Sequence, residues 1–437
     1  MQHPVGKIYL KPIYLSFLVY VSGLAALTIF KPRRQPWWTV VTLGLIDRRR
    51  PPISLLSVLV NVLCVGAVLD FLYRGEIFHQ SLDLSFSRVG FVDDTSARIV
   101  IRAPFHSNTP VEIDASTTST EAIKQIMEVS EANDFVATFL LPGLMPDTDY
   151  TYKTNASHSG AFRTAKPDSK RWSLAATSCI KPFYPYNPLS HGLRIEGFEY
   201  LGEHYATSPF DMMLFLGDFI YIDLPLSYGW TKEHYQTAYR QVYASPSWSP
   251  ALRSVPWLHV YDDHEIINDW SAGESGLYQP AMAPFHAYQG FANPPANFGR
   301  EKTYFTFHKG DIAFFVMDTR RYRVDQQVEG GSGKTMLGLA QRDDLEKWLV
   351  DEKRWKVVVS SVPFTRNWVG NDSWAGYLWE RDYLLAKMKA TEGVIILSGV
   401  SELDILLSCS NTNYCHHRIA TNTQQRFSQL FLLGKAL

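Results

Sequence analysis

Oxygen-bearing side chains follow two predicted strands of this chain, at the point where each strand ends. An apolar run from Phe210 stops at Gly217, and Asp218 and Tyr221 come directly after it. A second apolar run ends in the segment YDDHEIINDW, residues 261–270. Because the carboxyl ends of parallel strands meet at one edge of a sheet, we expect these side chains to lie together. Carboxylates, a phenol and an imidazole at one edge predict a metal site.

Each motif taken alone has a simpler explanation. A Gly-Asp pair at a strand end is usually a turn and an Asp-Asp pair is usually solvated, because short motifs often match by chance. Their joint occurrence, followed by further apolar strands at 311–318 and 393–399, favours the metal site. Apolar strands that each stop at polar residues indicate an α/β sandwich with its chemistry on one edge. Two cations held there would suit a hydrolase of phosphate esters.

Seven segments together resemble one known family. They are SCI (178–180), LGDFIY (216–221), YDDHE (261–265), MDTRRYR (317–323), LGLAQRDDLEKWL (337–349), DSWAGY (372–377) and IILSG (395–399). The chain resembles the PhoD-type alkaline phosphatases of the calcineurin-like metallophosphatase superfamily over about residues 85 to 399. The resemblance implies a four-layer αββα sandwich that holds iron and calcium and hydrolyses phosphomonoesters or phosphodiesters.

The resemblance assigns an iron site to three residues. Asp218 would bridge two metals, Tyr221 would bind iron as a phenolate, and Cys179, at the end of RWSLAATSC, matches the family's thiolate ligand. A thiolate and a phenolate favour a ferric ion over calcium. A small buried residue remains the alternative for Cys179, since this is the commonest fate of a free cysteine.

The second metal site and the proton donor are expected in the segment after residue 261. Asp263 and Asn268 match the positions that serve the second metal, and their oxygens suit calcium. His264 would lie near the leaving-group oxygen, as the superfamily's general acid does. These assignments also rest on the resemblance.

Two arginines are candidates for binding the substrate. Arg320 and Arg321 could bind a phosphate group bidentately, although an arginine pair more often belongs to a salt-bridged structural element. Asp262 and Asp318 are expected to support the site.

Composition sets broad limits on the class of protein. The chain has 437 residues, which is long enough for two or more domains. Its net charge of −1 gives no argument for nucleic-acid binding. Four cysteines, at scattered positions, give no disulfide framework.

The N-terminal part predicts a membrane anchor over residues 1–80. The runs 13–30 and 53–69 carry no charged residue, and aromatic residues extend the second to about 73. Both are near the lower length limit for a transmembrane helix, with a signal peptide as the alternative for the first. Six cationic residues lie between them: Lys31, Arg33, Arg34, Arg48, Arg49 and Arg50. This loop is therefore expected in the cytosol, and the catalytic part in the lumen or outside the cell.

A β-rich domain is predicted over residues 85–165. Short alternating strands with turn signals occupy this segment, and the spacing from Leu144 to Tyr150 resembles the tyrosine corner of fibronectin-type sandwiches. A linker follows at 166–170, and the hydrolase domain is expected from 171 to 399. Asn155 and Asn371 begin sequons, which fits a lumenal glycoprotein.

The resemblance stops at Gly399, where the family continues with Ser-Gly-Asp-[Arg/Val]-His and thereby supplies two more metal ligands. Residues 400–437 show no recognisable periodicity. Residues 418–428 (RIATNTQQRFS), read in a shifted frame, can encode Asp-Arg-His-Glu, which restores the motif after Gly399. Codons for Val400-Ser401, Thr412-Asn413 and His417-Arg418 can supply a splice donor, a branch site and an acceptor. We therefore interpret 400–437 as a retained intron with an out-of-frame exon, with true divergence as the alternative.

These observations predict a membrane-anchored, metal-dependent phosphatase or phosphodiesterase that is inactive in this truncated form. The alternative function is a non-catalytic, membrane-tethered scaffold or pseudo-phosphatase. That alternative predicts loss of several site residues, whereas Cys179, Asp218, Tyr221, Asp263 and His264 are all present.

Overall fold

The computed structural model describes residues 36–399 apart from 43, 45, 46, 48, 118, 119, 168, 170, 300, 301, 353 and 367–369. It also describes a few residues between 15 and 26, and the pairs 408–409 and 431–432. Most of the first predicted membrane span, at 13–30, and most of the tail after residue 399 therefore lie outside the described residues.

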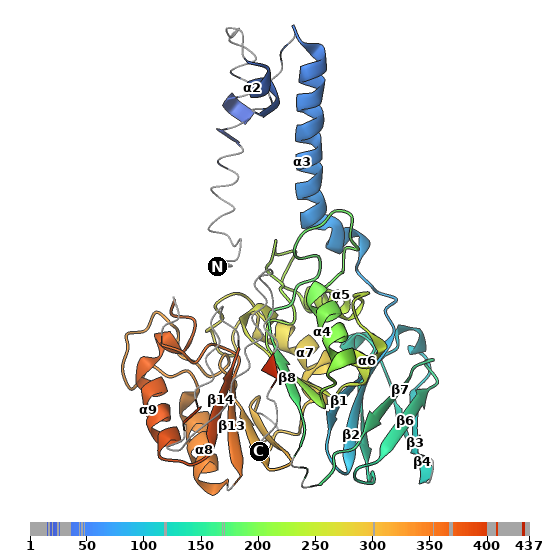
Figure 1. Cartoon of the computed structure of the whole chain (residues 1–437), viewed down its shortest axis with the longest axis vertical. Helices are drawn as coiled ribbons and strands as arrows, with labels where there is room; N and C mark the ends of the chain where they lie inside the picture. The colour runs from blue at the N-terminus through green and yellow to red at the C-terminus, as the bar shows by residue number, and fades with distance from the viewer. Residues whose placement is uncertain are drawn as a thin grey trace.

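Two antiparallel sheets form the β-rich part (Figure 1). One contains β1 (Phe86–Val92), β2 (Ser96–Arg102) and β5 (Val136–Pro142), and the other contains β3 (Val111–Thr117), β4 (Thr120–Met127), β6 (Asp149–Thr154) and β7 (Ser159–Arg163). Their facing sides share one apolar core, in which Val89, Ile113 and Phe139 are fully buried. The hydroxyl of Tyr150 accepts a hydrogen bond from the Met145 N–H at 2.9 Å, as the tyrosine-corner spacing predicts.

Two further sheets form the body that carries the predicted chemistry. The first, in the order β10-β9-β8-β16, contains β8 (Leu174–Thr177), β9 (Met212–Leu216), β10 (Trp257–Val260) and the edge pair β16 (Phe431–Leu432). The second contains β11 (Phe305–Lys309), β12 (Ile312–Val316), β13 (Trp355–Ser360), β14 (Val394–Ser398) and β15 (Ser408–Cys409), in that order. β8, β9 and β10 are parallel, as are β12, β13 and β14. Their continuous apolar runs are typical of parallel strands buried on both faces.

The two sheets pack face to face, with helices outside them (Figure 1). Leu214 and Leu258 of the first sheet share a core with Phe314 and Val357 of the second. Helices α4 (Glu196–Thr207), α5 (Lys232–Tyr243), α6 (Pro250–Ser254) and α7 (Tyr278–Tyr288) contribute to the core on the outer side of the first sheet. Helices α8 (Gly338–Asp351) and α9 (Leu378–Lys389) do the same for the second sheet. This is the mixed α/β architecture that the sequence predicts.

Short 3₁₀ turns complete the described elements. They are η1 (Pro104–His106), η2 (Glu131–Asn133), η3 (Asp263–Glu265), η4 (Gly290–Ala292) and η5 (Trp374–Gly376).

Helix α3 (Pro51–Phe78) projects from the body, which it meets at its C-terminal end (Figure 1). It begins with two prolines, which are well tolerated in the first turn. Within the described residues it alone is long and apolar enough to cross a membrane, and only 6% of its most apolar window is covered by protein. A short helix, α2 (Trp37–Thr42), packs beside its start. Two spans were predicted and the described part of the chain contains one of them.

Candidate metal centre

The ends of β8, β9 and β10 approach one another closely. Gly217, at φ +99°, leaves no room for a side chain, since an added Cβ would lie 2.5 Å from the Cβ of Asp262. Asp218 and Cys179 follow with φ values of 58° and 61°, in the left-handed region. The Cys179 N–H donates to the Gly217 carbonyl at 3.1 Å, and the Ile180 N–H donates to the Asp218 carbonyl at 3.0 Å. The backbone thus turns both side chains to the same edge.

Glu265 holds two of these strand ends together. Its carboxylate is fully buried and accepts the backbone N–H groups of Asp218 (3.0 Å), Phe219 (2.6 Å) and Asp262 (2.7 Å). Burial raises the pKa of Glu265 well above its usual range, and the charge of Asp218 adds to this rise. This side chain fixes the loop after β9 against the loop after β10.

The Asp218 carboxylate lies at the centre of the candidate site. Its Oδ2 accepts the Tyr221 hydroxyl at 2.9 Å and the Cys179 thiol at 3.4 Å. Its Oδ1 is buried and has no hydrogen-bond partner among the residues that the structure describes. Ligand atoms of Asp218, Asp263 and His264 lie within 4.8 Å of one another. A buried, unpaired carboxylate oxygen next to a thiol, a phenol and an imidazole fits a bound cation, because an uncompensated buried charge is otherwise costly.

His264 is oriented by a second carboxylate. Its Nδ1 lies 2.7 Å from Asp223 Oδ1, and its ring packs at 4.3 Å from the ring of Tyr221. With Nδ1 bonded to Asp223, Nε2 is the nitrogen available to a ligand. Burial by itself would lower the pKa of His264, but Asp263, Asp218 and Asp223 outweigh it and raise the pKa to about 10. In the absence of a cation the ring therefore carries a proton next to the acidic cluster.

A second acidic group surrounds Arg320. Oxygens of Asp263, Asp269 and Asp372 also lie within 4.8 Å of one another. The guanidinium of Arg320, which is 1% exposed, is 3.1 Å from Asp263, 2.8 Å from Asp372 and 2.5 Å from Asp262. Burial alone would raise the pKa of Asp263, but Arg320 above all lowers it to about 2. The charge of this group is thus largely balanced within the protein.

The structure brings most of the predicted residues to one place. Cys179, Asp218 and Tyr221 contact one another, and Asp263 and His264 lie beside them. Asn268 is close by through its backbone N–H, which donates to Asp223 at 2.9 Å. The adjacent residue, Asp269, donates its N–H to Asp263 at 2.6 Å.

The predicted substrate-binding and supporting residues have protein partners. Arg321 pairs with Glu274 at 2.5 Å near the surface, whereas Arg320 is buried in the cluster described above. The Oδ2 of Asp318 accepts the Tyr261 hydroxyl at 2.6 Å, and its Oδ1 accepts the Arg320 N–H at 2.8 Å. The phosphate-binding role of the arginines stays a prediction.

Three further residues of the site were not identified from the sequence. Asp223, Glu265 and Asp372 orient His264, the two strand ends and Arg320, respectively. Glu265 lies inside the motif YDDHE, and Asp223 follows the motif LGDFIY by two residues, so proximity to predicted ligands was the available signal. Asp372 begins DSWAGY, and nothing in that segment indicates a partner 52 residues away.

Three comparisons relate this fold and site to known proteins. A family profile described as PhoD-like phosphatase matches residues 174–401. Alkaline phosphatase D of Bacillus subtilis (strain 168) is 25% identical over 310 residues, which cover 59% of this chain and 51% of that protein. The chain thus spans about half the length of this curated relative. A solved structure titled "Structure of PhoD" superposes with a TM-score of 0.58 at 21% identity, covering 73% of this chain and 71% of the other.

Proposed function

Because the chain belongs to the PhoD-like phosphatase family, we propose that it is a metal-dependent hydrolase of phosphate esters. The observation that carries this proposal is the buried Asp218 Oδ1, which has no partner within a cluster of potential metal ligands. A non-catalytic scaffold would have no need to maintain such a costly charge.

The donor set supports two kinds of cation. Cys179 and Tyr221, both bonded to Asp218 Oδ2, would hold an iron ion with Asp218. Asp263 and Asn268 would supply oxygen ligands to calcium. Two such cations, when bound, neutralise charge on attacking and leaving oxygens and lower the pKa of a bound water.

The chain's own residues would position the proton donor, the acidic ligands and the substrate. His264 would deliver its proton to the leaving-group oxygen, with Asp223 holding the ring by the 2.7 Å contact. Arg320 would keep Asp262 and Asp263 in place through the ion pairs at 2.5 and 3.1 Å. Arg321 would contact substrate phosphate after leaving Glu274.

We further propose that residues 400–437 replace the true end of the domain. The support is the reading frame that restores Asp-Arg-His-Glu directly after Gly399. Sequencing the transcript across codons 395–420 tests this directly, and a spliced message is expected. The frame-restored chain should then release phosphate from simple esters when iron and calcium are present. No metal-dependent turnover by the restored chain would overturn the enzyme assignment in favour of a pseudo-phosphatase.

The same proposal includes a membrane anchor with two passes and a catalytic part outside the cytosol. The support is the apolar, uncovered helix α3 and the cationic residues that precede it. In sealed microsomes the part after Ser85 should resist protease. Asn155, exposed in the β6–β7 turn, should be glycosylated, with Asn155→Gln as the control. Digestion of that part in sealed vesicles would reverse the orientation.

A further inference from the structure

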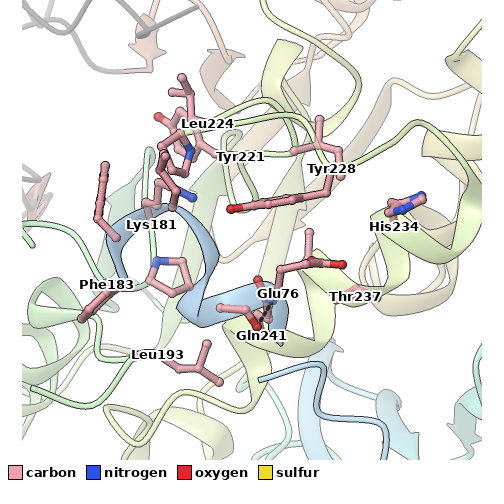
Figure 2. A pocket seen from close by; sticks show the side chains of 18 residues that line it. Glu76, Lys181, Phe183, Leu193, Tyr221, Leu224, Tyr228, His234, Thr237 and Gln241 are labelled. Atoms are coloured by element: carbon pink, nitrogen blue, oxygen red, sulfur yellow. Dashed lines mark hydrogen bonds between the residues drawn. The ribbon is translucent and has the colours of Figure 1, made fainter. Parts of the chain in front are cut away.

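A pocket lies between the end of α3 and the catalytic body (Figure 2). Its cavity volume is about 70 Å³. Helix α3 contributes Phe71, Leu72, Gly75 and Glu76 to its wall, and helix α5 contributes His234, Thr237, Ala238 and Gln241. Tyr221, which bonds to Asp218 and packs on His264, lines the same pocket. The pocket therefore adjoins the candidate metal centre.

The last turns of α3 are fixed to the body by specific contacts. Arg74 donates to the carbonyls of Ser190 and Pro188, both at 3.0 Å. Tyr186 donates to Asp70 at 3.0 Å, and Gln241 donates to the Gly75 carbonyl at 3.1 Å. Because α3 is a single helix from Pro51 to Phe78, these contacts also fix the height of the pocket, which is its position along the helix axis relative to the apolar segment.

That height corresponds to the headgroup layer of a bilayer. The uncharged run ends at Leu69, and the pocket-lining residues of α3 start at Phe71 and end at Glu76. At about 1.5 Å per residue they lie roughly 3–10 Å beyond the apolar segment. Each polar layer of a bilayer is roughly 5–8 Å thick. If α3 spans the membrane, the pocket opens among lipid headgroups.

The lining of the pocket suits a phosphate ester with an apolar neighbour. Four polar side chains line the pocket and are labelled in Figure 2: Lys181, Tyr221, Tyr228 and Glu76. In the part of the chain that the structure describes, the Lys181 ammonium has no hydrogen bond or ion pair. Phe183, Leu193 and Leu224 provide an apolar wall. Asp223 is the carboxylate whose charge acts on this ammonium, which keeps its hydrogen-bond donors for a ligand. Next to the metal centre such a cation can bind an anionic ester, while the apolar wall can contact the lipid's glycerol and upper acyl region.

We propose that this pocket binds the headgroup region of a bilayer lipid, so that the substrate is a phosphate ester carried on that lipid. This inference rests on the proposed hydrolase function and on α3 as a membrane anchor. The ester reaches Tyr221 and Asp218 without leaving the membrane surface. Lys181 contacts the phosphate group, and Glu76 with Tyr228 contacts polar groups attached to it.

The kinetic test uses the frame-restored chain reconstituted into phosphatidylcholine vesicles. Turnover of phosphatidic acid and phosphatidylglycerol in those vesicles is compared with turnover of p-nitrophenyl phosphate and bis-p-nitrophenyl phosphate. We expect at least one lipid to have the higher kcat/KM. Lys181→Gln should lower the ratio of lipid to soluble-ester kcat/KM by roughly 10- to 100-fold, the scale of one charge-assisted hydrogen bond. Ala238→Phe, which fills the pocket from α5, should lower the same ratio.

Lys309→Gln is the matched control. Lys309 is also a half-buried lysine, but it lies at the end of β11 that pairs with the start of β12, away from the carboxyl ends of the strands. It should leave the ratio unchanged. Turnover of the soluble esters with no lipid preference overturns the lipid assignment alone. No turnover of any substrate overturns the proposed function as well.

A binding measurement separates the lipid from free phosphate. Dihexanoyl phosphatidic acid, which is water-soluble, is titrated calorimetrically into the full chain, and inorganic phosphate is titrated in parallel. Wild type should bind the lipid at least tenfold more tightly than phosphate, and Lys181→Gln should lose most of that difference. Equal affinity for the two probes would contradict the lipid pocket.

Discussion

Two buried aspartates in this protein have nearly the same exposure and very different surroundings. Asp134 is 6% exposed and Asp218 is 7% exposed. Asp134 lies between the β-rich part and the body, where Arg102 and Arg240 each approach it to 2.8 Å and Tyr288 donates to it. Asp218 has a phenol and a thiol on one oxygen and nothing on the other.

The difference separates a structural carboxylate from one prepared for a ligand. At Asp134 two guanidinium groups compensate the carboxylate charge, so the cluster joins two parts of the chain. At Asp218 burial is the main cause of a raised pKa; the charge of His264 opposes this rise, and the nearby Asp263 adds to it. A buried carboxylate oxygen that has no hydrogen-bond partner among the described residues is best explained by a cation that binds there.

The largest effect on stability is expected at the junction. Asp134→Asn keeps the shape and tolerates the left-handed backbone at φ 55°, but leaves two buried guanidinium groups without a counter-charge. Such a loss costs about 3–5 kcal/mol in the free energy of unfolding, measured by denaturant titration. Asp149→Ala, which removes an exposed partner of Arg163, is the control and should cost less than about 1 kcal/mol. Similar costs at both positions would mean that the junction cluster is not a structural tie.

The next largest effect is expected at Asp218, where substitution should lower turnover but, unlike at Asp134, should not lower stability. Asp218→Asn also fits its left-handed backbone, at φ 58°, and removes a buried carboxylate whose Oδ1 has no partner among the described residues. The metal-free variant should therefore be at least as stable as the wild type. Its metal-dependent turnover in the frame-restored chain should fall by about 10²- to 10³-fold, the scale of losing one electrostatic contact in an active site. A clear loss of metal-free stability would show that Asp218 is structural, as Asp134 is.

A smaller effect, on metal affinity, is expected when Glu265, which holds the backbone of Asp218 in place, is replaced. Glu265→Gln keeps the shape but replaces a charged acceptor of three N–H groups by a neutral amide. Metal affinity should fall by about 10- to 100-fold, as for other groups that orient ligands. Glu380→Gln is matched, because Glu380 is also fully buried and accepts the N–H groups of Met336 and Leu337. This control should lower stability and leave metal affinity, measured calorimetrically, unchanged.

The smallest effect is expected from Tyr221→Phe. The variant loses one hydrogen bond to Asp218 and the proposed phenolate ligand, but keeps the ring that packs on His264. Iron retention and any visible charge-transfer absorption should decrease more than calcium binding does. Metal analysis after dialysis measures both, and equal iron retention in the two proteins would remove Tyr221 from the ligand set.

Much of the framework was predictable because it depends on local patterns. Apolar runs that stop at polar residues gave the strands β8, β9, β10, β12 and β14 and placed Asp218 and Asp263 at their ends. The span predicted at 53–73 lies within the helix Pro51–Phe78. The Tyr150 hydroxyl bonds back to the chain, at the Met145 N–H, as the resemblance of this segment to a tyrosine corner indicates. Each of these features depends on residues close together in the sequence, where burial periodicity and backbone preference are sufficient.

Only the tertiary structure decided which groups are paired. Arg320 bonds to Asp262, 58 residues away, and Glu265 reaches the Asp218 N–H across 47 residues. These contacts exist because the order β10-β9-β8 puts particular strand ends side by side, and because the second sheet packs against the first. The pocket beside Tyr221 depends in the same way on where α3 docks. The sequence determined which side chains the site contains. The packing of distant segments determined that Asp218 keeps an oxygen without a partner among the described residues, and that Arg320 does not face solvent.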